Sequence, residues 1–175
     1  MSDYGRQTGP QELEFNRRFE ASIEKVWEFL VDPEKRKMWF CGGSTEDHVG
    51  GAIVFEFDHR RLSDSAPPEK YANEEVATHH GEILEYDPPK RLAFTWFESA
   101  GAQASTVEIT LVPDGSDATE LRLVHKGVTG RDMLIGVLAG WHGHFDLLAE
   151  VLAGDRTTDF WVRDQRLESE YAAKV

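Results

Sequence analysis

Residues 81–96 read GEILEYDPPKRLAFTW, and this stretch predicts a β-hairpin. Its first half completes a strand-like segment that runs over residues 76–86. The Asp-Pro-Pro of residues 87–89 is a strong turn signal, because proline fixes its own φ and lacks the amide that a strand ladder needs. Apolar residues then alternate with other residue types from Leu92 to Trp96, which is typical of a strand with one buried face. We therefore expect two neighbouring strands of an antiparallel sheet here.

The same alternation occurs in four further segments on both sides of the hairpin. These are residues 13–19, 53–57, 107–111 and 121–125. Two stretches rich in turn formers interrupt the strands: a loop at residues 60–75 and the Pro-Asp-Gly of residues 113–115. The chain thus predicts about six or seven strands.

Helical patterns lie between and after the strands. Ser22 can cap a short helix over residues 23–30, and Asp32-Pro33 offers a cap and a first-turn proline for a second short helix. A long helix is expected over residues 131–153, opened by a capping box at residues 129–132 and ended by Gly154. Small and acidic residues lie on the side opposite its apolar stripe: Asp132, Gly136, Gly143, Asp146 and Glu150. Residues 158–174 are expected to form a short packing helix.

The composition is that of a globular domain. The chain has 175 residues, of which 40% are hydrophobic and 29% charged, enough for one sizeable core. Lys plus Arg total 19 and Asp plus Glu total 32, so the net charge is −13, which repels nucleic-acid phosphates and anionic membranes. The single cysteine, Cys41, cannot form an internal disulfide, and the polar N-terminus lacks the apolar stretch of a signal peptide. We expect a cytoplasmic protein with neither a nucleic-acid nor a membrane partner.

The order of these elements predicts an α+β fold. One strand is followed by two short helices, then by the remaining strands and by the long C-terminal α-helix. An antiparallel sheet has one face that needs cover, and the amphipathic helix can supply it. A curved antiparallel β-sheet wrapped around this helix leaves an internal cavity between the two.

Five motifs resemble a known superfamily. They are FEASIEKVW at residues 19–27, DPE at residues 32–34 with Trp39, GGAIVF at residues 50–55, residues 81–96 as quoted above, and GW at residues 140–141. In this order they resemble the helix-grip SRPBCC (START-like, Bet v-like) superfamily, and most of all its branch of homologues of the activator of heat-shock-protein-90 ATPase.

The resemblance covers most of the chain. It implies a single SRPBCC domain over residues 12–154, with a flexible N-terminus at residues 1–11 and a C-terminal helical extension at residues 155–175. The loop at residues 60–75 and the extension depart from the family pattern. The resemblance implies an apolar ligand cavity inside the sheet. It implies no activity, because this branch largely lacks a known one.

Eight residues are candidates for the wall of that cavity. They are Arg17, Trp39, Phe55, Phe57, Trp96, His125, Trp141 and Phe145. The aromatic members fit either an ordinary core or a cavity wall. His125 shares strand parity with Leu121 and Leu123, so we expect it to face inward, as a satisfied core histidine or as the polar anchor of a pocket. Arg17 either runs its stem along apolar surface or pairs with a ligand carboxylate or an internal acid.

No catalytic residue, metal site or cofactor is predicted. His79 and His80 should point to opposite faces of a strand, and His142 and His144 lie about 200° apart on a helix, so neither pair can chelate one ion. Cys41 has no activating base near it in the sequence.

Three functions fit the sequence. The leading hypothesis is a binder of a small hydrophobic molecule, acting as a carrier, a sensor or a stress-related protein. The first alternative is an enzyme of the polyketide cyclase or aromatase type, which the superfamily also contains and for which His125 with Arg17 is a thin acid–base set. The second is a chaperone partner, as the family name suggests. A homodimer through the 60–75 loop or the C-terminal extension is also compatible with the sequence.

Overall fold

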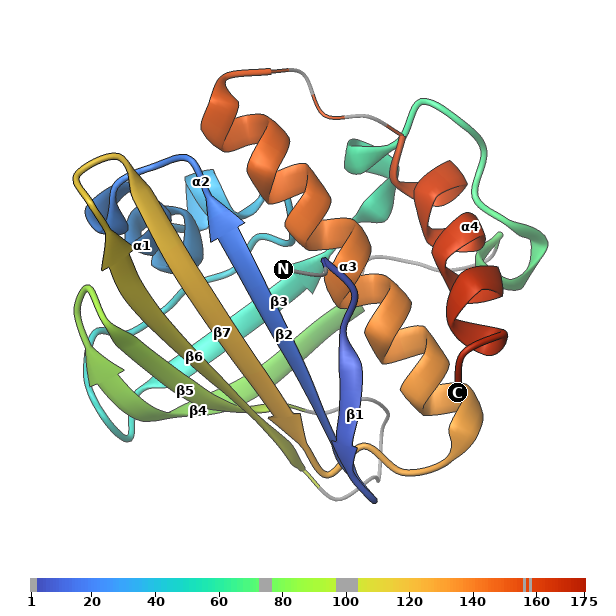
Figure 1. Ribbon diagram of the computed structural model, residues 1–175, viewed down its shortest axis with the longest axis horizontal. Coiled ribbons are helices and arrows are strands. Elements are labelled where there is room, and N and C mark those ends of the chain that lie inside the picture. Colours follow the sequence, from blue (N-terminus) through green and yellow to red (C-terminus); the bar gives the residue numbers. More distant parts are fainter. Residues whose placement is uncertain (1–2, 73–76, 97–103, 156, 158) are drawn as a thin grey trace.

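Seven strands form one antiparallel sheet in the computed structural model, which describes residues 3–72, 77–96, 104–155, 157 and 159–175 (Figure 1). The strands are β1 (Arg6–Gly9), β2 (Glu12–Phe19), β3 (Ala52–Phe57), β4 (Ala77–Asp87), β5 (Arg91–Trp96), β6 (Ser105–Asp114) and β7 (Ala118–Lys126). Their order across the sheet is β1-β2-β7-β6-β5-β4-β3. The predicted α+β class is confirmed. Residues 1–2, 73–76 and 158, at the ends of segments predicted above, lie outside the described residues.

Strands β4 and β5 form the predicted hairpin. Ile83 faces Phe94 across the pair, and Asp87 faces Arg91 where the turn closes. The side chains of Ile83, Leu92 and Phe94 are buried. The inner face of this hairpin is therefore part of the core.

Two capped helices follow β2, as predicted. The hydroxyl of Ser22 accepts a hydrogen bond from the Lys25 amide at the start of α1 (Ile23–Val31). The carboxylate of Asp32 accepts from the amides of Glu34 and Lys35, at 2.9 and 3.0 Å, at the start of α2 (Pro33–Arg36). These bonds satisfy amides that a helix start leaves free.

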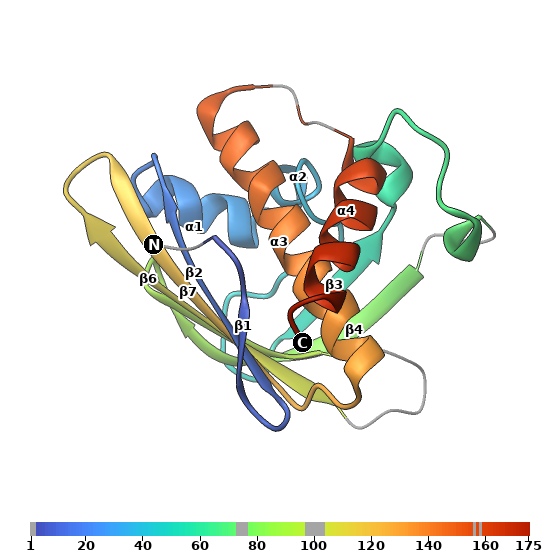
Figure 2. The same ribbon diagram turned by 45° about the vertical axis from the view of Figure 1, so that its right-hand side comes forward.

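The long helix α3 (Arg131–Ala153) lies against the concave face of the sheet (Figure 2). Its predicted apolar stripe is buried there; Leu138, Phe145 and Leu148 are inaccessible to solvent. Gly154 ends the helix with a φ of 82°, as predicted. The prediction of a capping box at residues 129–132 was wrong. Gly130 occupies the N-cap position with a φ of 86°, and a glycine has no side chain that could accept from the first-turn amides.

The second side of α3 is covered by another helix, α4 (Phe160–Ala172), which lies beside it in Figure 2. A Cβ at Gly143 would come within 3.2 Å of the Phe160 ring, so the small residue permits the close approach. Asp146 accepts a hydrogen bond of 2.6 Å from Arg163 of α4. Gly143 and Asp146, two of the small and acidic residues opposite the apolar stripe, therefore serve a helix–helix contact.

The N-terminal segment, predicted to be flexible, contains strand β1. Arg6 faces Glu14 and Gln7 faces Leu13 in the pairing with β2. The Gly5 amide donates to the hydroxyl of Tyr171 in α4, at 2.8 Å. Backbone pairing and this contact with α4 hold the segment on the domain, which local polarity alone did not indicate.

The loop predicted at residues 60–75 contains short helical turns and packs on α4. The turns are η1 (His59–Leu62) and η2 (Glu69–Tyr71). The carboxylate of Asp159, at the start of α4, accepts from the backbone amides of Asp64 and Ser65, at 3.1 and 2.6 Å. The loop and the C-terminal extension thus form one wall together.

Candidate functional site

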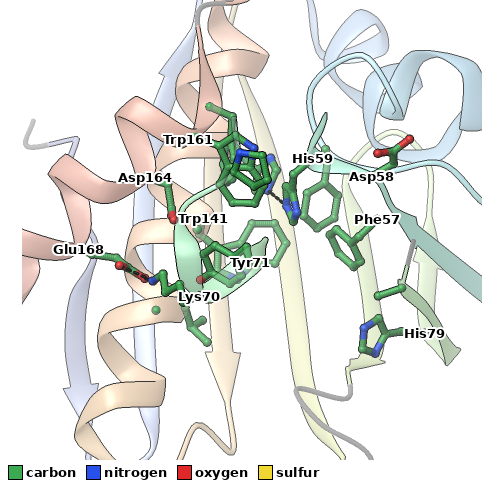
Figure 3. A pocket seen from close by; sticks show the side chains of 18 of the residues that line it. Phe57, Asp58, His59, Lys70, Tyr71, His79, Trp141, Trp161, Asp164 and Glu168 are labelled. Carbon is green, nitrogen blue, oxygen red and sulfur yellow. Dashed lines mark hydrogen bonds and ion pairs between the residues drawn. The ribbon is translucent and has the colours of Figure 1, made fainter. Parts of the chain in front are cut away.

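A cavity of about 570 Å³ lies between the sheet, α3 and the wall that the loop and α4 form together. Side chains from η1, η2, β4, β5, β7, α3 and α4 line it, and Figure 3 shows many of them pointing toward one space. The aromatic members are Phe40, Phe57, Tyr71, Trp96, Trp141, Phe160 and Trp161, together with the imidazoles of His59, His79, His125 and His144. Volumes of about 300–1,000 Å³ with mostly apolar walls are typical of small-molecule sites.

The aromatic rings hold one another in place in stacked pairs. The ring of Phe40 stacks on that of Trp141 with centroids 5.1 Å apart. The Tyr71 ring stacks on Trp161 at 5.0 Å, which joins η2 to α4. The His59 imidazole stacks on Phe160 at 4.8 Å and only 11° from parallel. Rings fixed in this way present flat, rigid surfaces to the cavity.

Two glycines keep the α3 side of the cavity open. Gly136 and Gly140 both line it, and a Cβ at either position would meet no atom within 4 Å. A glycine inside a helix costs about 0.5–1 kcal/mol relative to alanine. Alanine would fit at both positions, so the space around these two Cα atoms does not require glycine. The effect of the two glycines is a wider cavity.

A pair of neutral histidines lies on the wall formed by η1 and α3. Nδ1 of His144 lies 2.8 Å from the carbonyl oxygen of Trp39, which can only accept, so this nitrogen carries the ring proton. Nε2 of His144 then accepts from Nε2 of His59, 3.3 Å away. Burial lowers the pKa of His59 to about 4 and that of His144, also repelled by His59, to about 3. The pair offers the unprotonated Nδ1 of His59 as a hydrogen-bond acceptor.

His125 faces inward and has partners at both ring nitrogens. Trp141 donates its indole N–H to Nδ1 at 3.2 Å, so the ring proton is on Nε2 and points to the Ser105 hydroxyl 2.8 Å away. Ser105 in turn donates to the carbonyl of Trp96 at 3.1 Å. These contacts fix the orientation of His125 and of the Trp141 ring at the cavity wall.

A polar corner lies where η2 meets α4. Lys70 donates to the carboxylate of Glu168, and its ammonium lies 4.5 Å from the centroid of the Tyr71 ring. Asp164, one turn before Glu168, is only 5% exposed (Figure 3). Burial, reinforced by the charge of Glu168, raises the pKa of Asp164 to about 7.

The structure separates the eight predicted candidates into two groups. Phe57, Trp96, His125 and Trp141 line the cavity. The remaining four, Arg17, Trp39, Phe55 and Phe145, lie among other core residues.

These four positions have specific packing roles. Trp39 and Phe55 border a separate void of about 10 Å³, room for about one water molecule. Phe145 is fully buried and stacks on Trp141 and Trp39. Arg17 is 7% exposed and donates a hydrogen bond of 2.8 Å to Asp146 of α3. This agrees with the alternative in which Arg17 pairs with an internal acid. The acid–base pair of His125 with Arg17 is therefore not assembled at the cavity.

Several cavity residues were missed by the sequence analysis. They are His59, Tyr71, His79, His144, Phe160, Trp161 and Asp164. Most belong to the loop and the extension, which carry no strand or helix pattern that points to the sheet interior. The one available signal was the concentration of aromatic residues at Tyr71, Phe160 and Trp161 in segments that depart from the family pattern.

Other chemistry finds little support in the part of the chain that the structure describes. It contains no cluster of three or more histidine, cysteine or acidic side chains that could hold a metal ion. Burial raises the pKa of the Cys41 thiol to about 12, so this thiol is not activated as a nucleophile. None of the helices in the described ranges is long and apolar enough to span a bilayer.

Comparisons with known proteins agree with this fold. The family model of Activator of Hsp90 ATPase homolog 1-like proteins matches residues 20–153. No curated protein matches the chain. Among solved structures, a protein encoded by gene BPP1335 of Bordetella parapertussis is 30% identical, with a TM-score of 0.82 and coverage of 99% of this chain and 91% of the other.

Two further structures are more distant. CalU16 from Micromonospora echinospora is 25% identical, with a TM-score of 0.66 and coverage of 93% and 86% of the two chains. A conserved protein of unknown function, EF2215 from Enterococcus faecalis, shares the fold with a TM-score of 0.69 at 19% identity and coverage of 98% and 89%. The family match spans well over half of the sequence. The chain belongs to the family of Activator of Hsp90 ATPase homolog 1-like proteins, within the SRPBCC superfamily.

Proposed function

We propose that this protein binds a small hydrophobic molecule in the cavity between the sheet, α3 and α4, as a carrier or sensor. The observation that carries the proposal is the cavity itself, about 570 Å³ with walls of stacked aromatic rings. The glycines at positions 136 and 140 support it, since they widen the cavity at a cost to helix stability. A folding role alone would favour alanine at both positions.

The hydrogen-bond partners of the two candidate acid–base residues favour binding over the cyclase alternative. His125 is hydrogen-bonded at both ring nitrogens, and Arg17 is paired with Asp146 away from the cavity. General acid–base catalysis needs titratable groups that converge on one reacting atom. The His125 and Arg17 pair does not meet this requirement.

The test begins with native mass spectrometry of gently purified protein, where we expect a mass excess that disappears on denaturation. The protein freed of ligand is then titrated with the neutral fluorescent probe N-phenylnaphthylamine. A Cβ at position 140 would meet no atom within 4 Å, so Gly140→Leu directs a side chain into the cavity, and we expect it to weaken probe binding by about tenfold or more. Ser169→Leu adds the same side chain at an exposed position of α4 and serves as the control.

Two results would overturn the proposal. One is an unliganded native mass together with no probe binding by the wild type. The other is equal probe binding by the wild type and a folded Gly140→Leu variant. In the first case, stimulation of a bacterial heat-shock ATPase by the protein would favour the chaperone-partner alternative.

A further inference from the structure

The carboxyl group of Asp164 lies at the cavity wall with no hydrogen-bond partner among the described residues. Asp164 is 5% exposed and lines the cavity from α4. Within the described parts of the chain, no side chain or backbone group hydrogen-bonds to its oxygens or forms an ion pair with them, and these oxygens are open to the cavity. The nearest candidate cation, Lys70, donates to Glu168 instead. Figure 3 shows Asp164 on the same wall as Lys70 and Glu168, and its charge acts on the hydroxyl of Tyr71.

An unpaired buried carboxyl is costly to keep. Moving an ionised group out of water without a compensating partner costs several kcal/mol, and the group responds by holding its proton more tightly. The raised pKa of Asp164, about 7, expresses this cost. Unsatisfied buried polar groups are rare in folded proteins, and those in clefts are frequently functional. Among the described residues, two groups on buried side chains of the wall lack a hydrogen-bond partner within the chain: the carboxyl of Asp164 and the indole N–H of Trp161. Of the two, only Asp164 can carry a charge, so it decides the charge of a partner from outside the chain.

The surroundings of Asp164 favour a cation as that partner. Among the described residues of the wall, four are acidic (Asp58, Asp132, Asp164 and Glu168) and two are basic (Arg60 and Lys70). Lys70 pairs with Glu168, and Asp58 pairs with Arg61 beside the wall, which leaves Asp132 and Asp164 as the acidic groups to set against Arg60. The faces of aromatic rings attract cations, and the chain as a whole carries a net charge of −13.

The neutral histidines favour the same ligand chemistry. His59 presents an unprotonated Nδ1, which accepts hydrogen bonds and cannot pair with an anion. Tyr71 and Trp161 both line the cavity, and their stacking holds the rings so that an aromatic ligand can pack against them. A flat molecule with a charged donor at one end would satisfy the rings and the carboxyl together.

We propose that the cavity binds a flat aromatic molecule bearing a protonated amine, with the amine paired to the carboxylate of Asp164. This inference rests on the proposed function and specifies its ligand class. The amine donates charge-assisted hydrogen bonds to the carboxylate, and the ring system packs against the aromatic side chains of the wall, Tyr71 among them.

The test compares three probes that share one ring system and differ in charge: naphthylethylamine, naphthylethanol and naphthylacetate. Their affinities are measured by isothermal titration calorimetry at about pH 8, where an alkylamine is protonated and Asp164 is mostly ionised. Displacement of N-phenylnaphthylamine shows that each probe occupies the cavity. We expect the amine to bind about 10- to 100-fold more tightly than the alcohol, and the acetate to bind most weakly.

Two variants assign the preference to Asp164. In Asp164→Asn, we expect the affinity for the amine to fall to that for the alcohol, while the affinity for the alcohol stays unchanged. Asp155→Asn removes the same charge at an exposed position after α3 and should keep the preference for the amine. Melting curves establish that both variants are folded.

The outcomes separate this inference from the proposed function. Equal binding of the amine and the alcohol, or an amine preference that survives in Asp164→Asn, overturns the inference and leaves the hydrophobic cavity in place. Tightest binding of the acetate also overturns it and points to Arg60 and Lys70 as the anchors. Binding of none of the three probes, nor of N-phenylnaphthylamine, overturns the proposed function as well.

Discussion

Replacing Asp164 by asparagine should stabilise the unliganded protein at neutral and alkaline pH. The carboxyl is 5% exposed, and its pKa is raised to about 7 by burial, with a further contribution from the charge of Glu168 and an opposing one from Lys70. In the unfolded chain the same group has its ordinary value of 3.8. Because the folded protein holds this proton more tightly, ionisation of Asp164 favours unfolding.

The size and the pH range of the effect follow from these two values. Below about pH 4 the group is protonated in both states and costs nothing. The cost grows as the pH rises from about 4 to about 7 and is constant above that, with an upper limit of ~4 kcal/mol. The asparagine amide also prefers water to the cavity wall, so we expect a net gain of ~2 kcal/mol at about pH 8. For a chain of this length, that corresponds to an increase in Tm of about 4–8 °C.

The assay is thermal unfolding followed by circular dichroism at about pH 4.5 and at about pH 8. Native mass spectrometry first establishes that both proteins are free of ligand, since a bound amine would mask the effect. Asp155→Asn controls for the change in net charge and should melt like the wild type at both pH values. A difference in Tm between Asp164→Asn and the wild type that is equal at the two pH values would refute the reasoning.

Three further predictions follow from other parts of the structure. Gly140→Ala should raise the free energy of unfolding by about 0.5–1 kcal/mol, because alanine favours the helix and its Cβ would meet no atom within 4 Å. A lower free energy of unfolding in a denaturant titration would show that the helix needs glycine at this position. Arg17→Ala should lower the free energy of unfolding by about 2 kcal/mol, because Asp146 loses one of its two guanidinium partners and keeps Arg163, yet the folded variant should bind N-phenylnaphthylamine as the wild type does. Cys41, with a buried thiol of pKa about 12, should react with Ellman's reagent only after denaturation; rapid labelling of the native protein would show that the thiol is accessible.

The sequence could predict which side chains face inward. Strand parity placed His125 and Trp96 on the inner face, and helical spacing placed Trp141 and Phe145 toward the sheet. It could not separate inward residues that line the cavity from those that pack. Phe145 sits deep between the sheet and α3, whereas Trp141, one turn earlier, borders the open space. That difference depends on what covers α3 from its other side.

Asp164 illustrates the limit most clearly. In the sequence it is an acidic residue in a polar helix, which favours an exposed position. The structure buries it because α4 packs on α3 and η2 packs on α4. The family model ends at residue 153, before this helix begins, so the resemblance offered no guidance here either.

The order of the elements from β2 to α4, the caps at Ser22 and Asp32 and the family could be predicted from the sequence alone. The elements and their caps depend on residues close together along the chain, where periodicity and turn chemistry act directly. Only the tertiary structure decided the cavity. His59 meets His144 across 85 positions, and Lys70 meets Glu168 across 98. Contacts of this kind arise from how whole segments pack, and no local pattern of residues records which distant side chains will share one space.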